Sequence, residues 1–258
     1  MGGWAPIIAA GLLAGAALDA RAQEASRCGS EAVPAGRVAK VVDGRSFALD
    51  DGREIRLAAL EIPAEPPAGP AARAALENLL GSAPLVLRSA ASEPDRYGRT
   101  LAYAAAGARS AAHEMLASGH ARVGAHVGDP ACAAELLSRE RVARAAGLGL
   151  WADPRYSIMD SGDLKNLVAG RGHFAVVEGK VVSVRGRGGT IYVNFGRRWS
   201  QSLTVTISKR RERIFAGAGL DPKTLENRRV RVRGWIEVRN GPRIEASHPE
   251  QIEIAELN

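Results

Sequence analysis

The sequence has 258 residues and a formal net charge of +7; 46% of its residues are hydrophobic and 24% are charged. These proportions are typical of a folded globular protein and exclude an intrinsically disordered chain. The positive charge is concentrated in residues 166–258, which hold 17 Lys and Arg against 9 Asp and Glu, whereas residues 1–165 hold 18 against 19. We therefore expect the C-terminal third to meet a polyanion, the alternative being that its arginines only solvate the surface.

The N-terminus has the pattern of an export signal. An apolar, uncharged run, APIIAAGLLAGAA, covers residues 5–17, and ARA at 20–22 places small residues where a signal peptidase cleaves. The run is shorter than the roughly 20 apolar residues of a membrane span, and no later segment is apolar enough to make one. Although MGGW lacks the usual basic residue, we predict a signal peptide over 1–22 and a periplasmic or secreted protein; a buried helix is the alternative.

The chain contains two cysteines, Cys28 and Cys132. In an oxidising compartment a lone pair is expected to form a disulfide, and a bridge at Cys28 would anchor the terminus before the first strand. The alternative is a reactive thiol at Cys132, because Asp129 and Pro130 place it in the first turn of a predicted helix, where a thiol pKa falls. No histidine motif accompanies it, so we predict the disulfide.

Residues 36–153 alternate between strand and helix patterns. The segment 36–60 alternates apolar and polar side chains around DG turns at 43–44 and 51–52, which predicts three strands. The other predicted elements are strands over 84–90 and 99–107 and helices over 71–81, 110–120 and 129–151. Five strands with interleaved helices favour a small α+β Greek-key barrel of the oligonucleotide-binding (OB) type.

A second series of strands follows. Residues 154–170 are polar and rich in turn residues, which predicts a linker. Within 171–257, strands are predicted over 174–184, 190–196 and 202–208, then a helix over 209–219, a long hairpin over 228–247 and a last strand. This order predicts a second five-stranded OB-like barrel, so the expected architecture is two such barrels.

Other catalytic arrangements are not found in the sequence. The five histidines have no metal-ligand spacing, and no cysteine cluster joins them. RGRGG at 185–189 lacks the strand–Gly–Lys context of a nucleotide-binding loop, and no serine lies in a nucleophile elbow. These features argue against a zinc site, a nucleotide loop and a serine hydrolase.

Three segments of the first predicted domain belong together: VVDGRSFALDDGREIRLAALEIPAEP at 41–66, DRYGRTLAY at 95–103 and AGLGLW at 146–151. Over about residues 36–153 they resemble the staphylococcal-nuclease (thermonuclease-like) family, with DRYGRTLAY the most specific part. The resemblance implies a calcium-dependent phosphodiesterase on an OB-type barrel, in which Arg56 and Arg99 hold the scissile phosphate. Guanidinium groups suit this role because they bind two phosphate oxygens at once and stay charged.

The carboxylates of that family are not retained. Its DG turn carries a second, calcium-binding Asp where this chain has Arg45, although the first Asp is kept as Asp43. Its following loop supplies a calcium-binding Asp and then a glutamate base, where this chain has Glu61 and Ala64. Asp43 and Glu61 would form only a weak remnant site, because calcium prefers several oxygen ligands. The sequence therefore predicts a degraded calcium and general-base site, and no cofactor is expected.

Two arrangements of Arg45 are open. Arg45 either pairs with Glu61 in the space left by the metal, or joins Arg56 and Arg99 as a metal-free phosphate clamp. Glu65, one residue beyond the lost base, is a further catalytic candidate beside Glu61. We expect Glu65 to be constrained, because three prolines restrict its loop and a base must lie within hydrogen-bond reach of the attacking water.

Basic and aromatic residues are interleaved in the second predicted domain. Arg231, Arg233 and Trp235 alternate along one predicted strand, and a second group lies on and after another: Tyr192, Arg197, Arg198 and Trp199. Charges that meet the backbone and rings that stack on bases are what single-stranded nucleic acid requires. In the alternative, both tryptophans fill the barrel and the arginines face water.

The leading hypothesis is an exported protein that binds nucleic acid or another phosphate polyanion on a nuclease-derived scaffold, with little nuclease activity. A first alternative is an active phosphodiesterase, an endonuclease that uses Glu61 or Glu65 in a rearranged site and calcium as its cofactor. A second is a cell-envelope interaction protein in which both barrels bind protein or glycan. Salt-sensitive binding of DNA or RNA separates the leading hypothesis from the second alternative.

Overall fold

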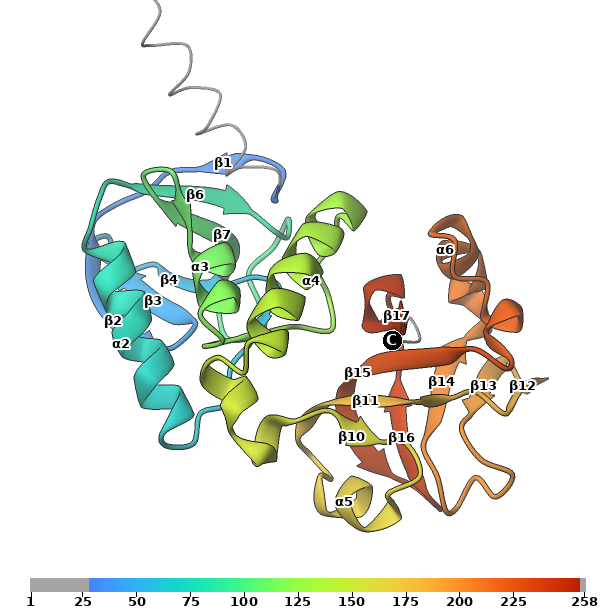
Figure 1. Ribbon diagram of the computed structural model, residues 1–258. Coiled ribbons are helices and arrows are strands. Elements are labelled where there is room, and N and C mark those ends of the chain that lie inside the picture. The colour runs from blue at the N-terminus through green and yellow to red at the C-terminus, as the bar shows by residue number, and fades with distance from the viewer. Residues whose placement is uncertain (1–27, 256–258) are drawn as a thin grey trace, which may run out of the picture.

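The computed structural model describes residues 28–255, which form two mixed α+β domains side by side (Figure 1). We call residues 28–156 the first domain and residues 159–255 the second domain. The predicted signal peptide, residues 1–22, lies outside the described residues. Between residues 28 and 255, no helix is both long enough and apolar enough to cross a membrane.

The first domain is built on a sheet with the strand order β1-β6-β7-β4-β3-β2, to which β8 is added beside β7. Its strands are β1 (Ala32–Val33), β2 (Val38–Asp43), β3 (Ser46–Leu49), β4 (Glu54–Leu57), β6 (Leu85–Ser89), β7 (Thr100–Ala106) and β8 (Arg109–Ser110). The predicted three strands over 36–60 are confirmed as β2, β3 and β4, which pair antiparallel. A separate two-stranded ladder joins β5 (Leu60–Glu61) to β9 (Arg122–Val123).

Three helices enclose the core of the first domain: α2 (Ala68–Leu80), α3 (Ala111–Ala117) and α4 (Pro130–Ala145). They bury Leu76, Met115 and Leu136 against the strands. The predicted helix over 129–151 is too long, because Gly147 and Gly149 adopt the left-handed backbone conformation that ends α4. A short 3₁₀ turn over Gly149–Ala152 follows.

The predicted disulfide between Cys28 and Cys132 is confirmed. The two Cα atoms lie 5.2 Å apart, and both side chains are buried. The amide of Cys132 donates to the Asp129 side chain at 2.7 Å, which caps α4 as the sequence indicates. The bridge ties the start of the described chain to α4, and the alternative of a reactive thiol at Cys132 is wrong.

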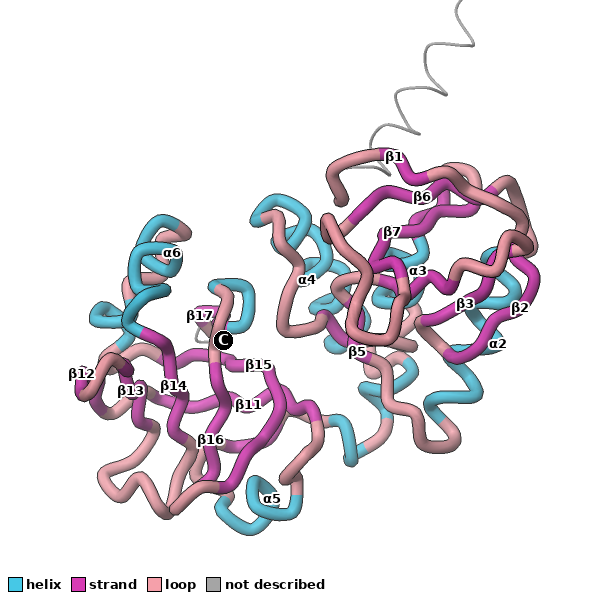
Figure 2. Tube along the Cα trace, turned by 180° about the vertical axis from the view of Figure 1, so that it is seen from behind, coloured by secondary structure: helices cyan, strands magenta, loops and turns pink. Residues whose placement is uncertain are grey.

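The second domain is built on a sheet with the order β10-β11-β15-β16-β14-β13-β12, to which β17 is added beside β15 (Figure 2). Its strands are β10 (Met159–Asp160), β11 (Phe174–Lys180), β12 (Ser183–Arg187), β13 (Thr190–Asn194), β14 (Thr204–Ser208), β15 (Arg229–Val238), β16 (Pro242–Glu245) and β17 (Ile252–Ile254). Its helices are α5 (Leu164–Ala169) and α6 (Glu212–Gly217). The core between them is mainly aliphatic.

The mixed α+β class is confirmed, but two closed five-stranded barrels are not observed. The sheets hold seven and eight strands, and each runs as an open path between two edge strands. Alternation along one strand shows which side chains are buried, but it does not show which strand edges meet. The two-residue strands β5 and β9 pair only with each other, so they do not close the first sheet.

Residues 154–170, predicted as a linker, largely belong to the second domain. Strand β10 pairs parallel with β11, and Leu167 of α5 is fully buried in the core. Both elements are too short to show apolar periodicity in the sequence. The predicted single strand over 174–184 is observed as two strands, β11 and β12. The Val181 amide donates to the Arg228 carbonyl and the Val182 amide to the Asn194 carbonyl, so the chain changes its pairing partner between these two residues.

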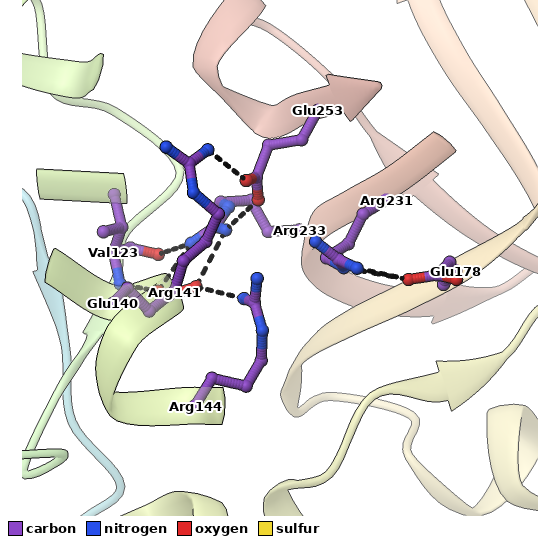
Figure 3. Close-up of polar contacts among 8 residues, drawn as sticks. All are labelled: Val123, Glu140, Arg141, Arg144, Glu178, Arg231, Arg233 and Glu253. Carbon is purple, nitrogen blue, oxygen red and sulfur yellow. Dashed lines mark hydrogen bonds and ion pairs between the residues drawn. The ribbon is translucent and has the colours of Figure 1, made fainter. Parts of the chain in front are cut away.

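A buried ion-pair network joins the two domains (Figure 3). Arg233 of β15 donates to both carboxylate oxygens of Glu140 in α4, at 2.8 and 3.0 Å, and also pairs with Glu253. The Arg233 side chain is 1% exposed and that of Glu140 is 0% exposed. Glu140 also accepts from Arg144 at 2.9 Å and from the Val123 amide at 2.6 Å. Arg233 in turn donates to the Val123 carbonyl at 3.1 Å.

Both central members of this network remain charged. Burial by itself lowers the pKa of Arg233, but the charges of Glu140 and Glu253 raise it above its ordinary value. Burial by itself raises the pKa of Glu140, but Arg233 and hydrogen bonds hold it below its ordinary value. Loss of either partner would therefore leave a buried charge without compensation.

A second polar contact between the domains centres on Glu250. Its Oε1 accepts from the amides of Val127 at 2.8 Å and Gly128 at 3.3 Å and lies 3.6 Å from Nδ1 of His126. The His126 ring packs against that of His248, with centroids 4.0 Å apart. Burial by itself raises the pKa of Glu250, but the contacts with His126 and the two amides lower it to about 2.

Replacing Arg233 by Met should strongly destabilise the protein, because Glu140 then stays buried without its main partner. Removing one member of a buried ion pair costs about 3 to 5 kcal/mol of the free energy of unfolding. The control is Arg229→Met on the same strand, whose side chain is 43% exposed and pairs with Glu178; this loss should cost about 1 kcal/mol or less. Urea denaturation measures both values, and equal losses would contradict the interpretation.

Glu250 should make stability depend on acid pH. Because its pKa is lowered in the folded protein, its contribution is present above its unfolded value near 4.5 and is lost as the pH falls toward 2. The difference in free energy of unfolding between the natural chain and Glu250→Gln should therefore shrink from pH 7 to pH 3. We expect a change of about 1 to 2 kcal/mol, since the side chain is partly exposed. Urea denaturation at several pH values tests this; a pH-independent difference would contradict it, and the exposed Glu245→Gln is the control.

Candidate phosphate-binding site

The site predicted from the sequence lies where β2, β3 and β4 come together. Asp43 ends β2, and its Oδ1 accepts from the backbone amide of Arg45 at 2.8 Å, which fixes the turn into β3. Arg56 of β4 lies directly across from Ser46 of β3 in the antiparallel register. Arg99 immediately precedes β7, the parallel neighbour of β4. The fold therefore brings together the three predicted phosphate-binding arginines.

Arg45 points to Glu61. Its Nη1 donates to Oε2 of Glu61 at 2.8 Å and to the carbonyl of Leu60 at 3.2 Å. The two side chains are only 21% and 12% exposed. Of the two arrangements that the sequence left open, the structure therefore has the ion pair with Glu61. Glu61 sits on the two-residue strand β5, which holds its backbone in place.

Arg56 is the least engaged of the three arginines. Its Nη1 reaches the Ser46 hydroxyl at 3.5 Å, which is the limit of a hydrogen bond. Burial lowers the pKa of Arg56, and the charges of Arg45 and Arg99 lower it further, while Asp43 and Glu61 oppose this. A guanidinium group whose pKa is depressed by like charges stands in a positive field. An incoming anion would relieve that repulsion.

Arg99 is held by an acid of its own motif. Its Nε and Nη2 donate to Oδ2 of Asp95 at 2.9 and 2.7 Å, and its guanidinium lies 5.0 Å from the ring centre of Tyr97. Burial by itself raises the pKa of Asp95, but hydrogen bonds from the Arg99 side chain and two backbone amides together lower it to about 2. Tyr97 is one of the exposed large side chains. Within the DRYGR motif, Asp95 therefore fixes the orientation of the Arg99 side chain next to the exposed ring of Tyr97.

The two candidates for a catalytic base, Glu61 and Glu65, each interact with an arginine other than Arg56. Ala64 is exposed and presents only a methyl group. Glu65 is also exposed, and its charge acts on Arg155, whose pKa is raised first by Asp153 and to a smaller extent by Glu65. The other candidate, Glu61, is tied to Arg45.

The residues present do not fit the calcium site that the family resemblance implies. Asp43 already accepts from the Arg45 amide, and one oxygen of Glu61 is paired with the Arg45 side chain. Calcium takes about six to eight oxygen ligands, and a guanidinium group among them opposes binding by its charge. Across residues 28–255, no three His, Cys, Asp or Glu side chains are placed to hold a metal ion.

One site neighbour was not predicted from the sequence. Arg122 lies directly across from Glu61 in the β5–β9 ladder and is buried, 5% exposed. Its guanidinium faces the rings of Phe174 at 5.1 Å and Tyr156 at 5.5 Å, and burial lowers its pKa while Glu61 and Glu140 raise it. A two-residue strand carries no alternation that would have revealed it. Glu61 therefore lies near two arginines, Arg45 and Arg122.

The predicted binding residues of the second domain do not act as one group. Arg231 pairs with Glu178, and Arg233 is buried between the domains, so the prediction that Arg233 contacts nucleic acid is wrong. Trp235 is 49% exposed and makes an edge contact with Phe174. Of the other predicted residues, Arg197, Arg198 and Trp199 are exposed, and Tyr192 is half-buried. Neither predicted tryptophan fills a core, so that alternative is wrong too.

Comparison with known proteins identifies part of the first domain. Residues 54–153 match the family described as "Staphylococcal nuclease homologue". The matched segment contains Arg56, Glu61, Glu65 and Arg99 and begins after Arg45. No match to a curated protein was found. Residues 54–153 of the first domain are therefore similar to the staphylococcal nuclease family, which supports an OB-like architecture for its strands.

The ion pair between Arg45 and Glu61 should appear as a coupling free energy. A double-mutant cycle with Arg45→Met and Glu61→Gln, measured by urea denaturation, should give a coupling of roughly 0.5 to 3 kcal/mol, because the two side chains touch and are largely enclosed. The exposed pair Arg73 and Glu77 on α2 is the control, with an expected coupling of about 0.3 to 0.5 kcal/mol. Additive effects at Arg45 and Glu61 would contradict the ion pair.

Proposed function

We propose that the first domain binds the phosphate backbone of nucleic acid, or of another phosphate polyanion, and has little nuclease activity. The observation that carries this proposal is the ion pair between Arg45 and Glu61. In the family that the domain resembles, these two positions hold carboxylates around a metal ion. Here a cation and an anion satisfy each other, while the phosphate-holding arginines Arg56 and Arg99 are kept.

Binding would centre on Arg56. Arg45 and Arg99 each hold a carboxylate, whereas Arg56 reaches only the Ser46 hydroxyl. A phosphate at Arg56 gains a planar donor that can contact two oxygens, within the positive field of the two other arginines. Tyr97, exposed next to Arg99, adds a ring that a base can stack on.

Hydrolysis would be weak because water activation has no suitable residue. A general base must reach the attacking water, and Ala64 cannot accept its proton. Glu61 is paired with Arg45, and the exposed Glu65 acts by its charge on Arg155. These contacts favour the binding hypothesis over an active phosphodiesterase that uses Glu61 or Glu65.

Export remains part of the proposal. The disulfide between Cys28 and Cys132 is consistent with an oxidising compartment such as the periplasm or the cell exterior. The third hypothesis, a cell-envelope interaction protein, predicts binding that does not depend on phosphate. Binding to DNA or RNA that weakens steeply with salt separates the two, because each released counterion contributes to the salt slope.

The purified chain should show little or no calcium-stimulated cleavage of DNA or RNA, when assays with calcium are compared with assays in EDTA. Loss of a positioned base alone typically lowers the rate by about a hundred- to ten-thousandfold. The variant Arg45→Asp/Glu61→Asp/Ala64→Glu restores the missing carboxylates and should regain calcium-dependent cleavage. Strong calcium-dependent cleavage by the natural chain, lost in Glu65→Ala, would instead establish a rearranged active site.

A binding assay tests the other half of the proposal. Arg56→Ala should weaken the binding of duplex DNA or RNA, measured by fluorescence anisotropy at low salt. The control is Arg53→Ala, a nearby arginine that pairs with Asp51 and bonds to the Pro34 carbonyl. Equal binding by the natural chain and both variants would refute a phosphate site at Arg56.

A further inference from the structure

We propose that the second domain carries a separate binding site for single-stranded nucleic acid on the outer face of β12 and β13 and the loop that follows β13. We call this surface the β12–β13 face and define it by Arg185, Arg187, Tyr192, Asn194, Arg197 and Trp199. The site goes beyond the function proposed for the first domain, because it lies outside the segment that matches the nuclease family.

Strand register places these residues on one side of the sheet. Arg185 lies directly across from Tyr192, and Arg187 lies across from Thr190. The alternate residues of the same strands, such as Ile191 and Val193, are buried in the core. Strand β12 is the edge of the sheet, so its arginines have no further strand beside them.

Charge pairing separates this face from strands β15 and β16. On β15 and β16 the arginines are matched by acids, since Arg229 and Arg231 share Glu178 and Arg243 pairs with Glu237. The three arginines of the β12–β13 face, Arg185, Arg187 and Arg197, are exposed and form no ion pair with any residue in 28–255, and the same holds for the adjacent Arg198. The β12–β13 face therefore carries positive charge that no acid within residues 28–255 compensates.

An exposed indole stands among these cations. Trp199 is 55% exposed, and it lines a depression of about 310 Å³ together with Arg185, Arg197 and Asn194. Its backbone packs closely against Gly241, where an added Cβ would lie 2.5 Å from the Trp199 carbonyl, so the loop is held in place. A ring that is fixed by its backbone and open on its face is suited to stacking on a base.

Polar side chains complete the depression. The Asn194 amide donates to the Ser183 hydroxyl at 3.2 Å, and its carbonyl accepts from the Thr204 hydroxyl at 3.2 Å. The three side chains orient one another, so donors and acceptors are held beside Trp199. The one nearby carboxylate, Glu226, accepts from the Val184 amide at the strand edge at 3.3 Å rather than from an arginine.

These features favour a single strand over other polyanions and over a protein. Arginines that follow the phosphates, with a ring between them, match the alternation of charge and base along an unpaired strand. A duplex hides its base faces, and a sulfated polysaccharide has none. A protein partner would be expected to meet a broad apolar centre, whereas the depression has only two large exposed apolar side chains, Trp199 and Val182, among its polar residues.

The test measures binding of a fluorescent ten-nucleotide oligothymidine, with oligouridine as a second probe, to the full chain and its variants by anisotropy. Trp199→Ala should weaken binding about five- to 150-fold, since one base stack is worth about 1 to 3 kcal/mol, while Trp199→Phe should retain most of it. Arg185→Gln/Arg187→Gln should lower the salt slope by about 0.7 for each lost phosphate contact. Arg229→Gln, at a paired and exposed arginine, is the matched control.

Three outcomes would overturn the proposal. Trp235→Ala weakening binding more than Trp199→Ala would move the site to β15. If Trp199→Ala does not change oligothymidine binding, and heparin competes as well as unlabelled oligothymidine does, the face is only a general polyanion surface. Arg56→Ala abolishing all oligothymidine binding would assign the strand to the first domain alone. Failure of the first-domain site has a different signature, because Arg56→Ala would then leave duplex binding unchanged while Trp199→Ala still weakened oligothymidine binding.

Discussion

The buried pairing of Arg233 with Glu140 fixes how the two domains meet. Two charges removed from water must compensate each other, and here one comes from each domain. Both also bond to the backbone of Val123, so the network holds β9. Strand β9 pairs with β5, which carries Glu61. The β5–β9 ladder therefore supports both the domain interface and Glu61, the acid that forms an ion pair with Arg45.

Carboxylate pairing sorts the many arginines of this chain into structural and available groups. Arg233 is structural, because its side chain is enclosed and both of its terminal nitrogens are hydrogen-bonded. Arg45 is structural in a different sense, since its ion pair fills a position where a metal-binding acid is expected from the family resemblance. Arg56 and the arginines of the β12–β13 face remain available for phosphate. Net charge alone does not make this distinction, because it counts paired and unpaired cations equally.

In the function that we propose, the candidate site keeps the electrostatics of phosphate binding and loses the parts that activate water. A guanidinium group can stabilise an anion without any proton transfer, so Arg56 and Arg99 need no partner acid to bind phosphate. A nuclease also needs a base or a metal-bound water in the correct place. The single ion pair between Arg45 and Glu61 occupies two of the positions on which that chemistry depends. In our proposal, substitution at a few positions thus separates binding from catalysis on one scaffold.

Local sequence patterns determined the elements of this protein, and tertiary contacts determined its sites. The alternation over 36–60, the cap at Asp129 and the lone pair of cysteines predicted β2 to β4, the start of α4 and the disulfide correctly, because each depends on neighbours in sequence or on a single possible partner. Sheet closure, the burial of Arg233 and the direction of Arg45 could not be predicted in this way. Sheet closure depends on which strand edges meet, and the two arginines depend on which of several acids, distant in sequence, approaches each of them. Only the packing of the folded chain decides either.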